Sequence, residues 1–345
     1  MEKFFTVTLG DKASEIYYGD SLASFWGSLE ALEGQKLFVC DTNTVKFIPE
    51  KRAKVVIASG EAFKNWQSVA QILEQARELN FGRDDYLIAC GGGVIGDITA
   101  FAASLYMRGC RLILVPTTLL AMVDATLGGK TAIDFAGSKN LVGTFYPANQ
   151  VYLWPQFLET LSPREYKNGL AEVLKHALIA QDEELLHFLE QNREALLSRQ
   201  PKVFRELLYI SLLVKKSFIE RDPFETKGIR EALNFGHTFA HALEVLGNFK
   251  RYSHGEAVAW GMAKALKAGV ELGLTKREFA QMAQALLVSY TFSSDYKVDD
   301  KEAFLKALQS DKKRRKGDIR FVLLKERGSY LMRPLPTELI RAVIE

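Results

Sequence analysis

The first half of the chain alternates short apolar runs, rich in β-branched residues, with longer segments that have the period of a helix. The runs predict strands over residues 36–40, 55–59, 86–90, 112–116 and 150–153, and the segments between them predict helices, for example over 65–79 and 97–106. This alternation is typical of a parallel sheet covered by helices. Ligands bind beyond the carboxyl ends of such strands, so the residues after each run are the first candidates for a site.

The pattern changes near residue 158, because long helical periods dominate the remainder of the chain. They cover residues 162–179, 183–197, 201–220, 233–246, 255–272 and 276–287, and a short strand-like run follows at 319–324. A chain of 345 residues is long for one hydrophobic core. We therefore expect an α/β domain with a Rossmann-like parallel sheet over residues 1–157 and a mainly α-helical domain over residues 158–345.

Composition and charge argue against several classes of protein. A content of 48% hydrophobic and 25% charged residues is that of a soluble globular protein, and a net charge of +3 is too small to indicate a nucleic-acid partner. No apolar run has the length of a signal peptide core or a membrane span, so we expect no membrane partner. Cys40, Cys90 and Cys110 have neither disulfide nor metal-ligand spacing, which favours a reduced, cytoplasmic compartment.

Three of the five histidines lie close together in the sequence, at His237, His241 and His254. His237 and His241 are four residues apart in a predicted helix, so their rings share one face. His254 follows a short polar break and opens the next predicted helix. Since neutral imidazole is the commonest side-chain metal ligand, the cluster suggests a hydrolytic or Lewis-acid metal centre; the alternative is that each is a core or capping histidine.

An acidic residue in an earlier predicted helix could complete this centre. Glu172, facing inward, would give a Glu-His-His set of the kind known for catalytic zinc, and Lys175, one turn on, would point into the same cavity. The alternative is an ordinary surface Glu–Lys pair. We interpret His176 and His187 as structural or surface histidines.

Glycine-rich and basic stretches in both halves suggest binding of anions. Residues 91–97, Gly-Gly-Gly-Val-Ile-Gly-Asp, lie between a predicted strand and helix, where backbone N–H groups can receive a pyrophosphate, although the stretch is not the Rossmann fingerprint and could be only a tight turn. Asp97 could cap the helix or meet a ribose hydroxyl. Asp124, the pair Gly128-Gly129, Lys130 and Lys139 form a second polar stretch suited to a phosphate or carboxylate; the alternative is a flexible solvated loop.

Basic residues of the second half are harder to interpret from pattern alone. Lys215 and Lys216 lie on a predicted helix, and Arg230 and Asn234 face the same way if the helix around 233–246 starts early enough. The basic run at 311–316 is typical of a solvated face, although one of its lysines could meet a small anionic substrate.

Taken together, these stretches resemble the 3-dehydroquinate synthase family, part of the sugar phosphate cyclase superfamily. The matching phrases occur in the family's order over roughly residues 35 to 330, at 91–97, 106–109, 115–124, 128–134, 139–143, 169–175, 233–238, 254–257 and 311–313. The resemblance implies a dehydroquinate synthase-like fold, with an NAD-binding N-terminal domain, a helical metal- and substrate-binding domain, and an active site in the cleft between them. It also implies a homodimer.

The implied activity is that of a phosphorus–oxygen lyase in the shikimate pathway of aromatic amino acid biosynthesis. The family converts 3-deoxy-D-arabino-heptulosonate 7-phosphate to 3-dehydroquinate and phosphate. It does so through NAD-dependent transient oxidation, β-elimination of phosphate, re-reduction and intramolecular aldol closure. The cofactors implied are NAD+ and Zn2+, with Co2+ as a possible substitute. The alternatives are another sugar phosphate cyclase, or a metal- and NAD-dependent polyol dehydrogenase that would release NADH.

The resemblance also assigns roles to individual residues. The metal ligands are Glu172, His237 and His254, which leaves His241 as a substrate-side residue. Residues that match the substrate site are Lys130, Asn140, Arg230, Asn234, Asp124, Lys175, Lys215 and one of Lys312 or Lys313, with Arg108 supplied by the neighbouring subunit. Residues that match the NAD site are Asp41, Asn43, Glu61, Lys64, Gly92, Gly93, Asp97, Thr117, Thr118, Lys130 and Lys139.

The chain departs from the family's usual pattern at several positions. Ser138 and Ala240 replace glycines, and Tyr146 and Trp154 stand where Gln and Asp are usual. The segment 222–230 is one residue longer than the common form, which leaves the choice between Lys215 and Lys216 open.

Overall fold

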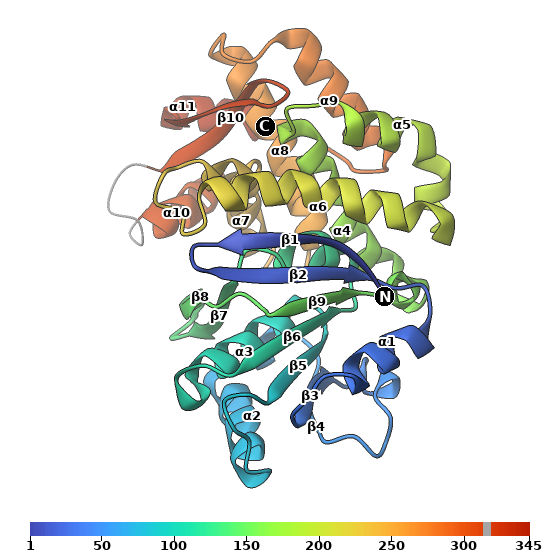
Figure 1. Ribbon diagram of the computed structural model, residues 1–345. Coiled ribbons are helices and arrows are strands. Elements are labelled where there is room, and N and C mark those ends of the chain that lie inside the picture. Colours follow the sequence, from blue (N-terminus) through green and yellow to red (C-terminus); the bar gives the residue numbers. More distant parts are fainter. Residues whose placement is uncertain (313–318) are drawn as a thin grey trace. The chain divides into compact units, whose positions relative to one another are not determined.

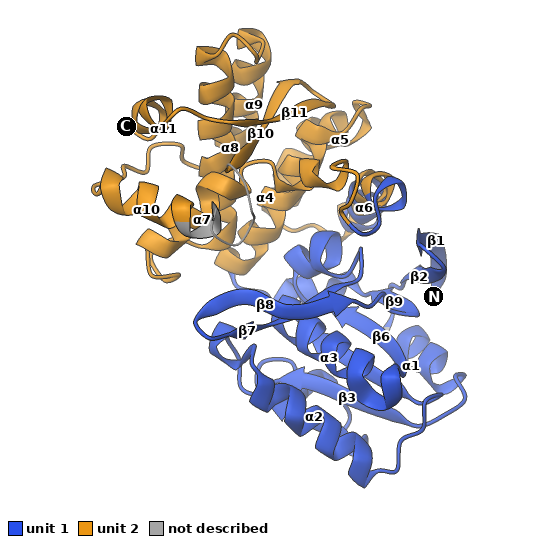
Figure 2. Ribbon diagram, turned by 90° about the vertical axis from the view of Figure 1, so that its left-hand side faces the viewer, with its two compact units in different colours: residues 1–162, 204–212, 219–224 blue, residues 163–203, 213–218, 225–345 orange. Residues whose placement is uncertain are grey.

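The computed structural model describes residues 1–312 and 319–345, which fold into two compact units (Figure 2). Unit 1 consists of residues 1–162, 204–212 and 219–224, and unit 2 of residues 163–203, 213–218 and 225–345. The first division falls after residue 162, and helix α6 (Phe204–Arg221) contributes residues to both units.

Unit 1 is built on a seven-stranded sheet in the order β1-β2-β9-β6-β5-β3-β4 (Figure 1). The strands are β1 (Glu2–Leu9), β2 (Lys12–Tyr18), β3 (Lys36–Asp41), β4 (Lys54–Ile57), β5 (Tyr86–Gly91), β6 (Arg111–Pro116) and β9 (Gln150–Leu153). Only β1 runs antiparallel, as the outer strand of a hairpin with β2, and all other pairings are parallel. The five predicted strands are confirmed as β3, β4, β5, β6 and β9.

Helices of unit 1 pack on this sheet because each presents an apolar face to it. They are α1 (Leu22–Glu30), α2 (Trp66–Glu78) and α3 (Gly93–Leu105). Asn65 caps α2, since its side-chain oxygen accepts from the backbone N–H of Ser68 at 3.0 Å. The predicted helix at 97–106 begins earlier, at Gly93, because Gly92 takes the extended N-cap conformation directly after β5.

A second hairpin of unit 1 contains the later part of the stretch that we weighed as a solvated loop, including Lys130 and Lys139. Strand β7 (Lys130–Phe135) pairs antiparallel with β8 (Ser138–Phe145). The turn between them uses two positive φ angles, 49° at Ala136 and 74° at Gly137, as a two-residue hairpin turn requires. The alternative of a flexible loop is therefore wrong, because backbone pairing orders these polar residues.

Unit 2 is mainly helical. Besides its part of α6 it contains α4 (Pro163–Ile179), α5 (Glu184–Leu197), α7 (His237–Leu246), α8 (His254–Glu271), α9 (Arg277–Ser289), α10 (Lys301–Lys312), α11 (Thr337–Val343) and the hairpin β10 (Arg320–Glu326) with β11 (Ser329–Pro334). Helix α8 lies at the centre and packs against α4, α7, α9, α11 and β10. The predicted helical periods and the late strand are confirmed, with one exception.

The exception is the predicted helix over 233–246, which the structure divides into two. Arg230–Asn234 form a 3-10 segment, and α7 begins only at His237 because Gly236 takes a left-handed conformation with φ 82°. The condition under which Arg230 and Asn234 would share a helix face is therefore not met, because four residues of a 3-10 helix exceed a full turn.

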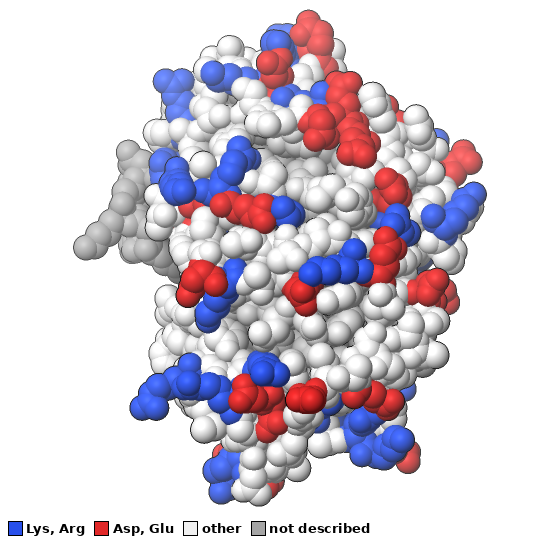
Figure 3. Space-filling model, in the orientation of Figure 1, with Lys and Arg blue, Asp and Glu red and all other residues white. Residues whose placement is uncertain are grey.

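Among the described residues, no helix combines the length and apolarity that a bilayer crossing would need. On the face drawn in Figure 3, basic and acidic side chains are interspersed, and the described residues of that face form no continuous basic surface. This mixed charge is consistent with the small net charge of the sequence.

Candidate metal centre and cofactor pocket

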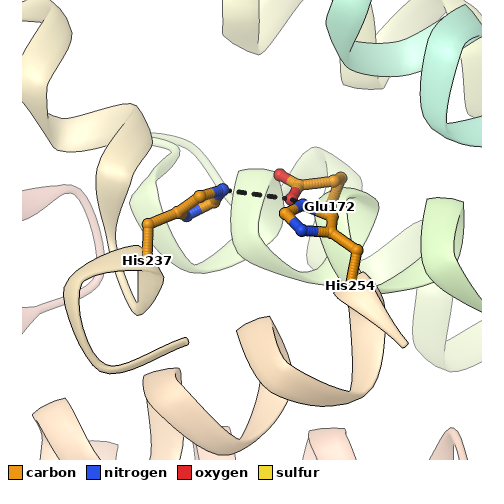
Figure 4. A group of neighbouring side chains, drawn as sticks. All are labelled: Glu172, His237 and His254. Atoms are coloured by element: carbon orange, nitrogen blue, oxygen red, sulfur yellow. Dashed lines mark hydrogen bonds and ion pairs between the residues drawn. The ribbon is translucent and has the colours of Figure 1, made fainter. Parts of the chain in front are cut away.

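Three side chains from three helices of unit 2 meet at one point (Figure 4). Oε1 of Glu172, on α4, lies 3.4 Å from Nε2 of His237 and 3.2 Å from Nε2 of His254. The two histidines are the first residues of α7 and α8. One donor atom from each of the three residues lies within 4.8 Å of the others, so a single ion could contact all three.

The backbone around His254 is fixed by hydrogen bonds at the start of α8. Ser253 and Glu256 form a capping box, in which the carboxylate of Glu256 accepts from the backbone N–H of Ser253 at 2.8 Å. The backbone N–H of Gly255 donates to Oδ1 of Asn168 at 2.8 Å. Asn168 precedes Glu172 by one turn of α4, so this contact sets the position of His254 relative to Glu172.

A close backbone approach positions His237. A Cβ atom on Gly236 would lie 2.7 Å from the backbone nitrogen of Met262 and 2.9 Å from the carbonyl oxygen of Val258, both on α8. A Cβ atom on Gly261 of α8 would lie even closer to α7, 2.1 Å from the carbonyl oxygen of Gly236. Glycines at these two positions therefore let α7 begin directly against α8.

The electrostatics of this cluster favour an ionised carboxylate. Burial by itself raises the pKa of Glu172, but the nearby charges of Lys175 and His237 hold that pKa well below its usual range. Lys175 pairs with Oε2 of the same carboxylate and is itself buried. At His254, burial lowers the pKa, but hydrogen bonds to Glu172 and Glu244 raise it to about 10.

This donor set suits a divalent metal ion. One carboxylate oxygen and two imidazole nitrogens are three protein ligands of the type found in catalytic zinc sites, where a fourth position stays open to water or substrate. Cobalt accepts the same ligands. His241 lies outside the group, next to His237, with the two ring centroids 5.7 Å apart. Of our first three candidate histidines, the structure thus brings His237 and His254 to Glu172.

Other predicted residues of unit 2 lie in varied environments. Arg230 is 2% exposed, and its Nε lies 3.5 Å from a carboxylate oxygen of Glu225, within the segment that is one residue longer than usual. Lys215 is buried and Lys216 is half-buried. Asn234 ends the 3-10 segment. Lys312 is the last residue of α10, and Lys313 lies outside the described residues.

Unit 1 contains a pocket at the carboxyl ends of β5 and β6. Its lining includes four predicted residues, Gly92, Gly93, Asp97 and Lys130. Gly92 precedes the first residue of α3, so the pocket includes a helix N-terminus with bare backbone N–H groups, which suits a phosphate. Asp97 is the fifth residue of α3 and does not cap it, which excludes one of the two readings of this residue.

A polar network, buried at Lys64 and exposed at Asn140, connects two of the predicted stretches of unit 1. Nζ of Lys64 lies 2.5 Å from Oδ2 of Asp97 and donates to Oδ1 of Asn140 at 2.5 Å. The backbone N–H of Asn140 donates to Asp134 at 2.8 Å, and Oγ1 of Thr131 donates to the carbonyl oxygen of Asp97 at 2.6 Å. The β7–β8 hairpin is thereby attached to α3 and to the residues before α2.

The remaining predicted cofactor residues lie along the same edge of the sheet. Asp41 ends β3, and its Oδ1 accepts from the backbone N–H of Asn43 at 2.8 Å. Glu61, shortly after β4, pairs with Lys139 at 3.3 Å. Thr117 and Thr118 follow β6 directly. Strands β3, β5 and β6 thus end within one residue of where the sequence predicted, and candidate residues lie at or directly after each of these ends.

Arg108 and Asp124 lie on short irregular turns of unit 1. Arg108 ends a 3-10 segment with left-handed backbone at Met107 (φ 50°) and Arg108 (φ 64°), and Asp124 lies in a single π-helical turn. Tyr146, one of the departures from the family pattern, donates its hydroxyl to the carbonyl oxygen of Cys110 at 2.6 Å. Trp154, another of these departures, packs its ring on Phe157.

Two residues of the centre were missed by the sequence reasoning. Asn168 holds the start of α8, and Glu244 lies 3.3 Å from Nδ1 of His254. The signal for Glu244 was its spacing, because a residue seven positions after His237 lies on the same face of one helix. No comparable signal exists for Asn168, whose partner is in a distant part of the sequence.

The chain matches known proteins over most of its length. Residues 54–168 match the family model of the 3-dehydroquinate synthase N-terminal domain, and residues 169–314 match that of the C-terminal domain. A 3-dehydroquinate synthase of Dictyoglomus turgidum is 41% identical over 283 residues, which covers 81% of this chain and 78% of that protein. One of Francisella tularensis subsp. mediasiatica is 38% identical over 323 residues and covers 90% of this chain and 89% of that protein.

Solved structures of sugar phosphate cyclases are similar throughout. A 2-deoxy-scyllo-inosose synthase complexed with carbaglucose-6-phosphate, NAD+ and Co2+ superposes with a TM-score of 0.89 at 26% identity and covers 99% of this chain and 98% of its own. A 2-epi-5-epi-valiolone synthase of Streptomyces hygroscopicus with NAD+ and Zn2+ gives 0.87 at 26% identity, with 97% of each chain covered. A probable glycerol dehydrogenase of Sinorhizobium meliloti, at 14% identity and a TM-score of 0.67, shares the fold alone.

Proposed function

The chain belongs to the 3-dehydroquinate synthase family, and from this premise we propose that it converts 3-deoxy-D-arabino-heptulosonate 7-phosphate to 3-dehydroquinate and phosphate. It would thus be a lyase of the shikimate pathway, which supplies aromatic amino acids. The observation that carries the proposal is the Glu172–His237–His254 cluster, whose donor atoms are in place for one ion. Curated relatives with this name are about 40% identical over four-fifths of the chain or more.

We propose NAD+ and a divalent metal ion as cofactors, since similar cyclases hold NAD+ with Co2+ or with Zn2+. Glu172, His237 and His254 would hold the metal, and the pocket around Gly92, Gly93 and Asp97 would hold NAD+. When bound, the metal supplies Lewis acidity and NAD+ supplies a reversible hydride acceptor. Unit 1 would then serve the cofactor and unit 2 the metal.

The protein's own residues would keep both anionic ends of the substrate in place. Arg230 offers a planar guanidinium that can hold a carboxylate or phosphate by two parallel hydrogen bonds, and Lys130, Lys215 and Asn140 add further donors. Lys175 would keep Glu172 ionised, which preserves its metal-binding oxygen. Tight holding matters in this reaction because its intermediates must stay bound between steps.

Three finer assignments belong to the same proposal. Zinc is the metal that we propose, because the donor set matches catalytic zinc. A homodimer is proposed from the family, and the exposed apolar side chains of Leu105 and Met107, beside Arg108, would suit such a contact. A cytoplasmic location is proposed from the three free, buried cysteines.

The test combines purified protein with NAD+, Zn2+ and the heptulosonate phosphate, and follows phosphate release and NADH absorbance together. We expect many turnovers of phosphate with no net NADH. NADH without phosphate would reassign the protein to the polyol dehydrogenases. If neither phosphate nor NADH appeared and another sugar phosphate were turned over instead, the protein would be reassigned to a different cyclase.

The metal assignment predicts that His237→Ala binds Zn2+ weakly and releases phosphate more than about 100-fold more slowly, because removing a ligand costs more than removing a residue behind one. Metal content after dialysis and initial phosphate rates measure both effects. His187→Ala, which removes a histidine on α5 that pairs with Glu183, should behave as wild type. Full metal content and activity in His237→Ala would contradict the assignment.

A further inference from the structure

One buried carboxylate beside the metal cluster has no role in the proposed mechanism. Glu244 lies in the last two turns of α7, is 9% exposed, and places Oε1 3.3 Å from Nδ1 of His254. The other ring nitrogen of His254, Nε2, lies 3.2 Å from Glu172. The ring is therefore held between two carboxylates, one on each nitrogen.

We propose that Glu244 positions His254 as a metal ligand by holding the ring proton on Nδ1. When the ring ligates a metal it is a neutral imidazole with one N–H, and an ionised carboxylate can only accept. With Nδ1–H donating to Glu244, the lone pair of Nε2 remains available and points toward Glu172. A carboxylate behind a ligating histidine both fixes the tautomer and makes the ligand more basic. This inference rests on the metal site of the proposed function.

The contacts around His254 leave one degree of freedom, the rotation of its ring, for Glu244 to control. The backbone of His254 is already fixed by the Ser253 cap and by the bond from Gly255 to Asn168. What these contacts do not determine is the rotation of the imidazole about its side-chain bonds. The contact with Glu244 determines it, because only one ring orientation presents Nδ1 to α7 and Nε2 to α4.

The two ligating histidines are supported in different ways. Nδ1 of His237 lies 3.3 Å from the backbone carbonyl oxygen of Phe235, so its support is neutral and belongs to the main chain. His254 depends on a side chain that carries charge. Helix α7 thus contributes a ligand at its first residue and, two turns on, the support for a ligand of α8. A substitution at Glu244 should therefore weaken His254 alone.

The experiment measures metal affinity without reference to catalysis. Wild type, Glu244→Ala, Glu244→Gln and the control Glu271→Ala, an exposed carboxylate at the end of α8, are stripped of metal and titrated with Zn2+ against a chromogenic chelator. We expect Glu244→Ala to bind Zn2+ about 10- to 100-fold more weakly. Glu244→Gln keeps an acceptor oxygen and should lose less Zn2+ affinity. Glu271→Ala should bind Zn2+ as tightly as wild type.

A spectroscopic readout separates positioning from general stability. In Zn2+-loaded protein with 15N-labelled histidine, the Nδ1–H proton of His254 should exchange slowly with solvent in wild type and faster in Glu244→Ala, because the variant lacks the carboxylate that accepts it. Wild-type affinity in Glu244→Ala would overturn the proposal. So would an affinity loss in Glu244→Ala that leaves this exchange rate unchanged. If wild type binds Zn2+ but turns over no substrate, the proposed function fails and this proposal is still decided by the variants.

Discussion

At the scale of single residues, burial suppresses the ionisation of the three cysteine thiols. It raises the pKa of Cys40 to about 11 and of Cys110 to about 12, and it also raises the pKa of Cys90. We predict that a thiol reagent at pH 8 modifies none of them in the native protein and all three after denaturation, because the thiolate is the reactive form. Rapid modification of one cysteine in the native state would contradict this.

The same shifts predict how alkali affects stability. Above the ordinary thiol pKa near 9, the thiols ionise in the unfolded chain while the folded protein keeps them protonated. The unfolded state then binds fewer protons, so the free energy of unfolding falls as pH rises, by at most about 1.4 kcal/mol per pH unit for each thiol. Denaturation of Cys40→Ala at pH 8 and pH 10 measures this, and the variant should lose less stability than wild type over that interval.

Single residues of the site could be predicted only in part from the sequence. Spacing along one helix suggested His237 and His241 as partners, whereas the structure places His254 of the next helix beside Glu172. That meeting depends on the bond between Gly255 and Asn168, and no local pattern encodes a contact between residues so far apart. The sequence pattern offered Glu172 and all three histidines as candidates, similarity to a family selected His237 and His254 over His241, and spacing would have supplied Glu244.

At the scale of elements, Gly236 decides where α7 begins. Gly236→Ala would place a Cβ at φ 82° and within 3 Å of two backbone atoms of α8. We expect a loss of about 2–4 kcal/mol in the free energy of unfolding, more than the roughly 1 kcal/mol for left-handed strain alone. Zn2+ affinity should fall as well, because His237 is the next residue.

A second glycine provides the matched control. Gly273 also has a positive φ, 65°, but a Cβ there would meet nothing within 4 Å. Gly273→Ala therefore carries the strain without the clash and should leave Zn2+ affinity unchanged. Chemical denaturation and metal titration of both variants measure the difference. Equal losses of stability would mean that the contact between α7 and α8 is looser than the structure indicates.

Elements were predictable where burial imposes a pattern. Strand β5 is buried along its whole length and was correctly predicted from its apolar run, whereas β8 has no fully buried residue and was missed. Hydrophobic periodicity reports which face is buried, so a strand that is exposed on both faces leaves no period to read. The pairing of β7 with β8 also depends on the turn at Ala136 and Gly137, which is not one of the common hairpin dipeptides.

At the scale of the whole molecule, the sequence indicated an α/β half and a helical half but not how α6 is shared. Residues 204–212 and 219–224 belong to unit 1, and residues 213–218 between them belong to unit 2. A long helix has one continuous period, and its pattern does not tell which neighbours each turn will contact. The allocation of α6 therefore required the three-dimensional structure.

Because the two proposed sites lie in different units, we can predict how their ligands affect stability. The proposed NAD+ pocket consists of unit 1 residues, and the proposed metal ligands all belong to unit 2. Each ligand should raise the free energy of unfolding independently of the other, by about 2.7 kcal/mol when its concentration is roughly 100 times its Kd. In thermal melts, NAD+ should therefore still raise Tm after a chelator has removed the metal, and Zn2+ should still raise Tm in Asp97→Ala.

The variants make the two effects separable in one experiment. His237→Ala should lose the response to Zn2+ and keep the response to NAD+, and Asp97→Ala should show the reverse, because each substitution removes a contact in only one unit. If His237→Ala lost both responses, the metal would be a condition for NAD+ binding. The two sites would then be coupled through a shared conformational equilibrium, which a measured coupling free energy could quantify.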